Sequence, residues 1–160
     1  MSTKDRLSDS LSAAVPTDTT HRFTVLVAEW NTEITHALRD GCVETLQQQG
    51  VGKDRIRVVS VPGSFELSSA AAYFAARPDC DAVICLGCVI QGETRHFDFI
   101  CQAVANGTTQ VGIQYLKPVI FGVLTTDTRQ QALERAGGKL GNKGSEAAQA
   151  ALQMLAVMQK

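Results

Sequence analysis

The 160-residue sequence lacks the features that define several broad classes of protein. It has no apolar run approaching the ~20 residues of a membrane-spanning helix, so no membrane partner is expected. Its charges balance, with 15 Lys and Arg against 16 Asp and Glu, which argues against a nucleic-acid partner. Its three histidines are scattered along the chain, so no metal site is expected. An anionic ligand would therefore have to be held by a local arrangement of residues.

The start of the chain also lacks the apolar segment of a secretory signal peptide. Residues 1–22 are polar, rich in Ser, Thr and Asp, and interrupted by Pro16. This composition predicts a flexible N-terminal arm before one domain that covers residues 23–160. The five cysteines are an odd number, and a chain of this length can form a core without disulfides. Reduced thiols, and with them a cytoplasmic location, are therefore expected.

From residue 23 onward the sequence alternates regularly between strand-like and helix-like segments. Short apolar, β-branched runs predict strands at residues 23–28, 56–61, 82–90 and 119–124. Apolar residues at helical spacing predict helices at residues 32–49, 65–76, 95–110, 128–136 and 144–158. The run at residues 82–90 is apolar almost throughout, as in a central parallel strand that is covered on both faces. We therefore predict an α/β protein, a flavodoxin-like three-layer α/β/α sandwich with a four-stranded parallel sheet.

In such a sheet, ligands bind beyond the carboxyl ends of the strands, so the loops that follow the strands are the expected site. The first loop contains Trp30, the only tryptophan, whose indole offers a flat face to a planar ring. Its neighbour Asn31 offers a hydrogen-bond donor and an acceptor. The alternative is that Trp30 packs at the rim of the core while Asn31 caps the next helix.

The second loop follows the strand at residues 56–61 and contains Pro62, Gly63, Ser64 and Glu66. Ser64 can cap the helix that follows, and the amides of the first turn could bind a carbonyl or an anion. Glu66 could accept hydrogen bonds from a polyol. A simple capping arrangement, with Glu66 favoured by the helix dipole, is the alternative.

The third loop, residues 91–98, is the richest in chemical groups. Gly92 allows the backbone to approach a ligand, and the amides of Glu93 and Thr94 are expected to open a helix, which is a suitable phosphate site. His96 is expected in the first helical turn, where an imidazole suits proton transfer at neutral pH. A purely structural role for an isolated histidine is the alternative.

The fourth loop, residues 125–127, is expected to cap the next helix, which ends at Arg135. Arg135, Lys139 and Lys143 form a local basic cluster, and the planar guanidinium group matches phosphate oxygens. Cations that complement a helix C-terminus are the alternative. The glycine- and lysine-rich residues 137–144 match neither the P-loop spacing nor the dinucleotide-binding spacing, so nucleotide hydrolysis and dinucleotide binding are disfavoured.

A C-x-x-C sequence is formed by Cys85 and Cys88. Redox and metal-binding motifs place this sequence in a loop or at a helix start, whereas here it lies within the most apolar predicted strand. Alternation along a strand would also place the two side chains on opposite faces. Buried structural thiols are therefore expected.

Several segments taken together resemble the lumazine synthase family, also called the riboflavin synthase beta chain family. The matching segments are AEWN (28–31), VPGSFEL (61–67), GCVIQGETRHF (87–97), PVIFGVLT (118–125), QALERAG (131–137) and GNKG (141–144). Each segment is weak alone, but their order and spacing fit across about residues 23–158. The resemblance implies an enzyme that needs no cofactor.

The reaction that the resemblance implies is the formation of 6,7-dimethyl-8-ribityllumazine in riboflavin biosynthesis. The small-molecule substrates are 5-amino-6-(D-ribitylamino)uracil and 3,4-dihydroxy-2-butanone 4-phosphate, and phosphate and water are released. Such a condensation needs positioning, proton transfer and a phosphate clamp more than a strong nucleophile. A non-catalytic shell protein that binds a flavin or a lumazine is the alternative.

Carried over position by position, the resemblance also implies roles for individual residues. Trp30 stacks on the pyrimidine, and His96 is the proton donor. The ribityl chain and the surroundings of the ketone phosphate are held by Ser64, Phe65 and Glu66. The pyrimidine pocket is lined, mainly through backbone, by Cys88, Val89 and Ile90. The phosphate is bound by Glu93 and Thr94 and, from the adjacent subunit, by Arg135, with Phe121 also from that subunit and Lys143 a weaker candidate.

The resemblance further implies a homopentamer, and in some family members twelve pentamers form a 60-subunit icosahedral shell. An insertion between the positions of Arg135 and Lys143 is associated with members that stop at pentamers or decamers. The segment is short here, which favours the shell. Riboflavin synthase is a partner that such a shell could enclose.

Overall fold

The computed structural model describes residues 20–159. The flexible arm expected at residues 1–22 lies outside this part of the chain, except for its last three residues, and so it stays a prediction. Within residues 20–159, no helix combines the length and the apolar character needed to cross a membrane.

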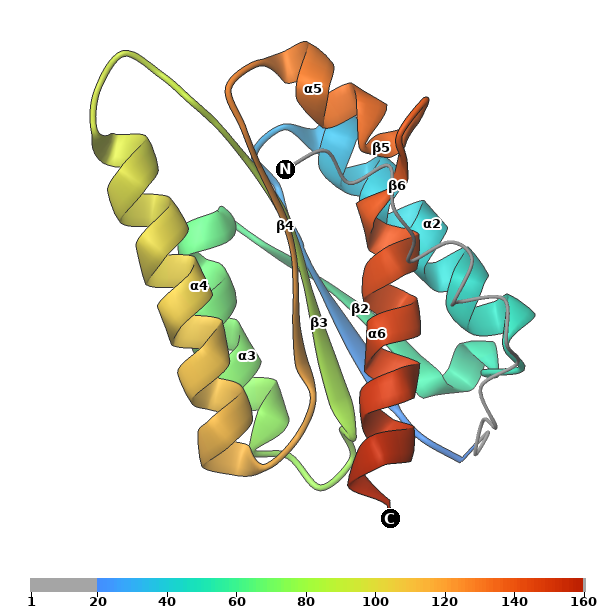
Figure 1. Ribbon diagram of the computed structural model, residues 1–160. Coiled ribbons are helices and arrows are strands. Elements are labelled where there is room, and N and C mark those ends of the chain that lie inside the picture. The colour runs from blue at the N-terminus through green and yellow to red at the C-terminus, as the bar shows by residue number, and fades with distance from the viewer. Residues whose placement is uncertain (1–19, 160) are drawn as a thin grey trace.

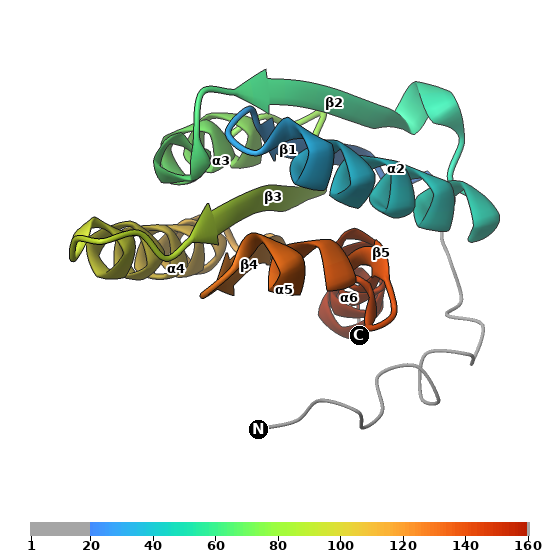
Figure 2. The same cartoon turned by 90° about the horizontal axis from the view of Figure 1, so that it is seen from above.

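A sheet of four parallel strands forms the centre of the molecule, in the order β2-β1-β3-β4. The strands are β1 (Phe23–Ala28), β2 (Ile56–Val61), β3 (Ala82–Ile90) and β4 (Val119–Thr126). One face is covered by α2 (Thr32–Gln48) and α6 (Lys143–Met158), and the other by α3 (Leu67–Ala75) and α4 (His96–Tyr115) (Figure 1). Figure 2, seen from above, shows the strand order and the helical layers on either side. The predicted three-layer α/β/α sandwich of flavodoxin-like type is confirmed.

The apolar run of β3 is buried because both of its faces are covered. Ile84, Leu86 and Cys88 belong to the core on the α2 and α6 side, while Val83 and Cys85 belong to the core on the α3 and α4 side. The prediction that Cys85 and Cys88 lie on opposite faces as buried thiols is therefore confirmed. Burial raises the pKa of Cys85 to about 12 and that of Cys88 to about 11, which removes them from thiolate chemistry at neutral pH.

Some element boundaries differ from the sequence-based expectation. The helix expected at residues 65–76 is a 3₁₀ turn, η2 (Ser64–Glu66), followed by α3. The helix expected to end at residue 110 continues to Tyr115, because Val111 still packs into the core, and it ends where Leu116 adopts a left-handed backbone with φ 51. A short 3₁₀ turn, η1 (Lys53–Arg55), was not predicted.

The segment between β4 and α6 also differs from expectation. Helix α5 (Arg129–Glu134) is capped by Thr128 rather than by residues 125–127. Thr128 Oγ1 accepts from Gln131 N at 3.2 Å, and Gln131 Oε1 accepts from Thr128 N at 3.2 Å, which is a capping box. A small antiparallel pair, β5 (Ala136–Gly138) and β6 (Gly141–Asn142), follows the helix and was not predicted.

Helices α2 and α6 approach each other unusually closely where α6 begins. A methyl group on Gly144 would lie 1.8 Å from the Leu38 carbonyl oxygen, so only glycine fits there. Asn142 Nδ2 donates to the Ala37 carbonyl at 3.0 Å, while its Oδ1 accepts from Gly144 N at 2.8 Å and from Ser145 N at 3.3 Å. These contacts fix the start of α6, and with it the hairpin that precedes it.

Candidate active site

A cavity of about 620 Å³ lies at the edge of the sheet where the carboxyl ends of β1, β2 and β3 meet the start of α4. This is where parallel sheets place their ligands. Most of the predicted site residues line it: Trp30, Ser64, Phe65, Glu66, Cys88, Val89, Ile90 and His96. It is also lined by Asn31, Gly63 and Ile100. Ile100 was missed, although it lies one helical turn after His96 and therefore on the same side of α4.

Two glycines at or beside the site lie so close to neighbouring side chains that an added methyl group would displace them. Gly63 has an extended backbone, with φ −154 and ψ −179, but a methyl group there would lie 2.9 Å from Trp30 Cδ1 and 3.2 Å from Glu66 Oε2. A methyl group on Gly87 would lie 2.5 Å from Ser64 Oγ. The two glycines thus let the side chains of the first two loops lie directly on the ends of the strands.

The first loop presents its aromatic ring to solvent. The Trp30 side chain is 72% exposed, so the alternative of an indole packed into the rim of the core is wrong for this chain. Phe65, on the second loop, is 56% exposed and lines the same cavity. Large apolar side chains that remain exposed at a cavity are typical of ligand-binding surfaces.

Ser64 does not cap the helix as expected. Gly63 occupies the N-cap position of η2, and no side-chain cap is formed there or at the start of α3. Ser64 is only 6% exposed, and its Oγ has no hydrogen-bond partner among the described residues. A buried hydroxyl without a partner carries a free-energy cost. Ser64 as a residue lines the cavity, but its Oγ is closed off from solvent.

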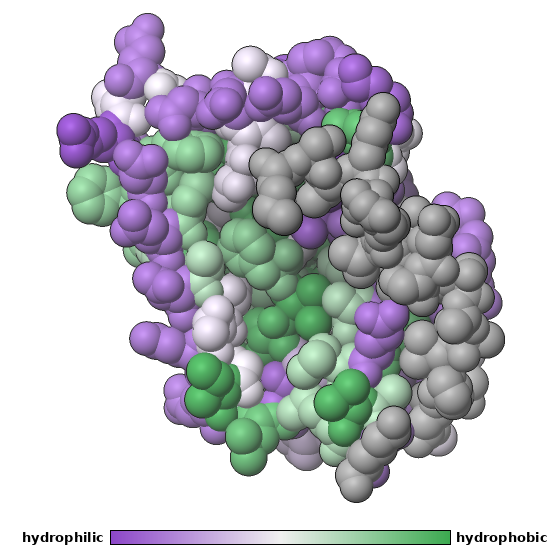
Figure 3. All heavy atoms as spheres, viewed as in Figure 1, coloured by the Kyte–Doolittle hydropathy of each residue, from purple (hydrophilic) through white to green (hydrophobic). Residues whose placement is uncertain are grey.

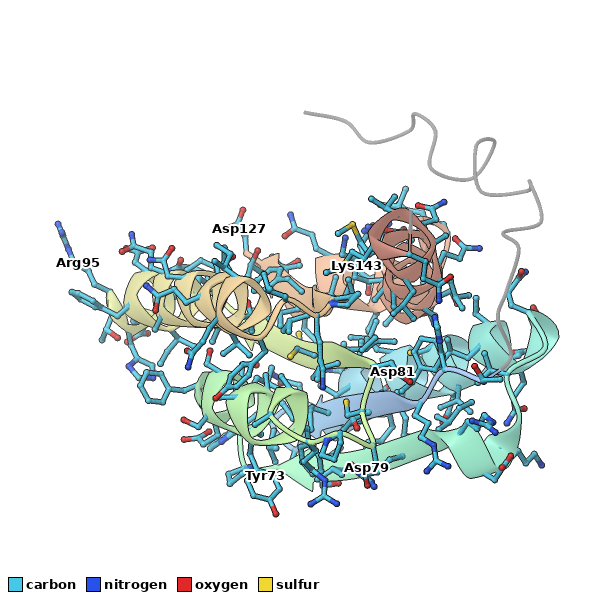
Figure 4. The ribbon with its side chains drawn as sticks, turned by 90° about the horizontal axis from the view of Figure 1, so that it is seen from below. Tyr73, Asp79, Asp81, Arg95, Asp127 and Lys143 are labelled. Atoms are coloured by element: carbon cyan, nitrogen blue, oxygen red, sulfur yellow. The ribbon has the colours of Figure 1, made fainter. Side chains whose placement is uncertain are left out.

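His96 lies in the first turn of α4, as predicted, where it is the first helical residue, and it is exposed. The expectation that the amides of Glu93 and Thr94 open the helix is wrong, because Arg95 is the N-cap residue and both amides precede it. Thr94 Oγ1 accepts from the His96 backbone N–H at 3.4 Å. Figure 4 shows Arg95 extending away from the rest of the molecule. Glu93 and Thr94 are exposed and do not line the cavity.

Two predicted residues, Phe121 and Arg135, lie apart from the cavity of their own chain. Phe121 is half-buried on the edge strand β4 and packs against the core on the α3 and α4 side. Arg135 follows α5 and forms a two-pronged ion pair with Glu146 of α6, at 2.9 and 3.2 Å. The Leu140 carbonyl accepts a further hydrogen bond from Arg135 at 2.8 Å.

The predicted basic cluster is largely neutralised within the chain. Lys143, at the first turn of α6 (Figure 4), lies 3.5 Å from the Glu146 carboxylate that Arg135 also contacts. Lys139 forms an ion pair with Glu134 at 3.0 Å, and this hydrogen bond lowers the pKa of Glu134. Glu134 and Glu146, close to these cations in the sequence, are the residues from which the neutralisation could have been predicted.

The fold and the cavity together define a class: a flavodoxin-like α/β protein with an aromatic-rimmed ligand pocket at the carboxyl edge of its sheet. The family model described as 6,7-dimethyl-8-ribityllumazine synthase matches residues 20–159. The chain belongs to this family, whose members are transferases of riboflavin biosynthesis.

Relatives with this same name match over nearly their whole length. The protein from Cytophaga hutchinsonii is 56% identical over 156 residues, which are 98% of both chains. The protein from Porphyromonas gingivalis is 53% identical over 148 residues, or 92% of both chains. The protein from Salinibacter ruber is 49% identical over 140 residues, which are 88% of this chain and 90% of the relative.

Proposed function

We propose that this chain condenses 5-amino-6-(D-ribitylamino)uracil with 3,4-dihydroxy-2-butanone 4-phosphate to give 6,7-dimethyl-8-ribityllumazine, with the reacting groups held in the cavity at the carboxyl edge of the sheet. One observation carries the proposal: an exposed indole, Trp30, and an exposed imidazole, His96, line the same cavity in a member of the lumazine synthase family. An indole can stack on a planar heterocycle, and an imidazole can transfer a proton.

All the groups that react belong to the two substrates. The 5-amino nitrogen of the uracil attacks the ketone carbon, and loss of water gives an imine. Removal of a proton next to the imine expels inorganic phosphate, and the enol that forms becomes a new ketone. The ribitylamino nitrogen then attacks this ketone carbon and closes the ring, and loss of a second water gives the lumazine. Two waters and one phosphate leave, with no change in overall oxidation state, so orientation and proton transfer are the needs of catalysis.

The uracil is proposed to lie against the Trp30 indole, with its polar edge toward the backbone of Val89 and Ile90 at the end of β3. Both residues are half-buried and line the cavity. Cys88 is assigned a role through its backbone, because burial raises the pKa of its thiol to about 11 and so keeps the thiol from acting as a nucleophile at neutral pH. The ribityl chain is assigned to Ser64, Phe65 and Glu66, where the exposed Glu66 carboxylate can accept hydrogen bonds from a polyol.

His96 is proposed as the proton donor. Its position at the start of α4 places the imidazole beside the cavity while leaving it open to solvent, so it can exchange protons between turnovers. The ketone phosphate is assigned to the neighbouring Glu93 and Thr94, with the Glu93 carboxylate directed away from the anion. Thr94 precedes the N-cap residue Arg95, and its hydroxyl accepts from the His96 N–H, so the proposed phosphate lies just ahead of the α4 N-terminus, where negative charge is favoured.

The remaining contacts are proposed to come from a second copy of the chain. Arg135 and Phe121 do not line the cavity of their own chain, and both belong to the side of the molecule formed by β4, α5 and α6. If this side packs beside the cavity of a neighbour, Arg135 meets the phosphate, with Lys143 next to it. Glu146 and the Leu140 carbonyl hold the Arg135 guanidinium in place and leave further N–H groups for oxygen atoms.

The surface of the chain supports such an assembly. Figure 3 shows apolar side chains gathered over β4, between α4 and α6. On α4, Phe99 is 70% exposed and Ile113 is 69% exposed. We propose that the chain forms a homopentamer. Because the β5–β6 hairpin is short, we further propose that twelve pentamers form a 60-subunit shell. The proposed location is the cytoplasm, where the five free thiols stay reduced. Riboflavin synthase is the proposed cargo of the shell.

The test is a mixing assay with the purified chain and both substrates. The lumazine and free phosphate are followed together, against the uncatalysed background. Accelerated release of equal amounts of both supports the proposal. If the uracil binds but neither product forms faster than background, the chain is a binding shell rather than the catalyst that we propose.

A further inference from the structure

The first loop contains an asparagine whose backbone is unusual for the start of a helix. Asn31 lies at the N-cap position of α2 with φ 61 and ψ 51, in the left-handed region. Asparagine adopts this conformation more readily than most residues. Its carbonyl oxygen accepts the first helical hydrogen bonds, from Ile34 N at 2.9 Å and Thr35 N at 3.0 Å. The left-handed turn therefore sets the direction of the chain directly after Trp30.

The side chain of Asn31 is not used to cap the helix. An N-cap asparagine usually accepts from an amide of the first turn, but no such bond is present here. Instead, Asn31 Nδ2 donates to the Cys88 carbonyl oxygen at 3.2 Å, across 57 positions of sequence. Because a carbonyl oxygen only accepts, the amide group can be placed in only one orientation. The bond joins the loop after β1 to the end of β3, and both residues line the cavity.

Trp30 has little else to hold its ring. The side chain is 72% exposed, so burial immobilises only a small part of it. Its Cδ1 lies close over Gly63, where a methyl group would approach it to 2.9 Å. Trp30 thus belongs to a loop that the Asn31 side chain joins to the end of β3 by a hydrogen bond. Its indole lies next to Gly63, just after the end of β2. Glu29 N donates to the Val61 carbonyl at 2.9 Å and still holds the start of the loop to β2. Loss of the Asn31 bond would therefore loosen the loop at Trp30, on the β3 side, without removing any group from the reacting atoms.

We propose that Asn31 is a positioning residue, whose left-handed backbone and hydrogen bond to the Cys88 carbonyl together hold the Trp30 indole at the place where a planar ring stacks. The identity of that ring as the ribitylamino-uracil rests on the proposed function, whereas the positioning of Trp30 does not. Asn31 then determines affinity for the uracil and takes no part in proton transfer or in phosphate binding.

Two substitutions separate the backbone from the side chain. Asn31→Gly keeps the left-handed conformation at no steric cost but removes the amide group. Asn31→Asp keeps the size and still tolerates this conformation, but a carboxylate cannot donate to the Cys88 carbonyl. Leu116→Gly is the matched control, because Leu116 also has a positive φ of 51 but lies after α4, next to the start of β4 and away from the cavity.

The first measurement needs no substrate. Trp30 is the only tryptophan, so time-resolved fluorescence anisotropy under selective tryptophan excitation reports its ring alone. Both Asn31 variants are expected to lose a larger share of the anisotropy to local motion on the picosecond-to-nanosecond scale than the wild type does. Leu116→Gly is expected to match the wild type. Unchanged local motion in both Asn31 variants would overturn the proposal.

The second measurement is steady-state kinetics. Removal of one hydrogen bond, worth about 0.5–1.5 kcal/mol, predicts a roughly two- to twelvefold rise in KM for the uracil in both variants. The KM for the ketone phosphate and kcat are expected to stay within about twofold of the wild type. A fall in kcat with an unchanged KM for the uracil would overturn the positioning role. If the wild type itself shows no turnover, the proposed function fails, and the anisotropy measurement alone decides the role of Asn31.

Discussion

The contact between Gly63 and Trp30 predicts that Gly63→Ala weakens substrate binding without weakening the fold. Gly63 has an extended backbone that alanine adopts freely, so the substitution introduces no backbone strain. The added methyl group would lie 2.9 Å from Trp30 Cδ1 and 3.2 Å from Glu66 Oε2. Both distances are shorter than carbon atoms and carboxylate oxygens normally approach, so the two side chains must move.

The size of the effect follows from how exposed these side chains are. Trp30 is 72% exposed, so its ring can swing into solvent, and we expect the free energy of unfolding to change by less than about 0.5 kcal/mol. Stacking of a base on an aromatic ring contributes about 1–3 kcal/mol. If displacement of the ring removes about 1 kcal/mol of the stacking free energy, the KM for the uracil should rise roughly fivefold.

The assay compares KM values for both substrates and the urea midpoint of unfolding in the wild type, Gly63→Ala and Gly52→Ala. Gly52 precedes η1, at the opposite end of β2, where an added methyl group would meet only the flexible Asp54 carboxylate. Gly52→Ala is expected to leave both KM values unchanged. An unchanged KM for the uracil in Gly63→Ala, with the fold intact, would refute the argument that the Trp30 position controls binding.

Three further predictions concern His96, Arg135 and Asp79. His96→Ala should lower kcat by about 10²-fold, the low end for general acid–base help, while ligand binding persists; an unchanged rate contradicts a proton-transfer role. Arg135→Ala should raise KM for the ketone phosphate by about tenfold or more and leave KM for the uracil unchanged; an unaltered phosphate KM excludes the clamp. Arg77 first, and Arg57 next, hold the pKa of Asp79 well below its usual range. The stability contributed by Asp79 is therefore full above about pH 4 and lost as pH falls through the lowered pKa. The difference between wild type and Asp79→Asn in urea midpoint should shrink in acid, and a constant difference would exclude this charge effect.

The arrangement of the sheet could be predicted because it depends on local patterns. The apolar run at residues 82–90 needs cover on both faces, and this alone places helices on both sides. Regular alternation then makes the sheet parallel, so the carboxyl ends of the strands meet at one edge. For this reason the loops that contain Trp30, Ser64 and His96 were expected at one site, and the structure brings them to one cavity.

The finer features could not be predicted because they depend on partners far apart in sequence. Whether Asn31 caps its own helix or bonds to Cys88 is decided by where β3 ends beside β1. Ser64 is likewise kept from capping by its burial against Gly87. The pairing of Arg135 with Glu146 depends on the β5–β6 hairpin, whose few residues carry no strand-like pattern.

Because most of the thiols are buried, the number of cysteines that react with a thiol reagent reports whether the chain is folded. Cys42, Cys80, Cys85 and Cys88 are buried, and desolvation raises the pKa of Cys42 to about 12, so these four should be protected from an alkylating reagent at neutral pH. Cys101 on α4 is only partly buried. A brief pulse of alkylation, read by mass, should therefore add at most one label to a folded chain and five labels to an unfolded one. The number of added groups then gives the folded fraction directly, in a mixture and without an optical probe.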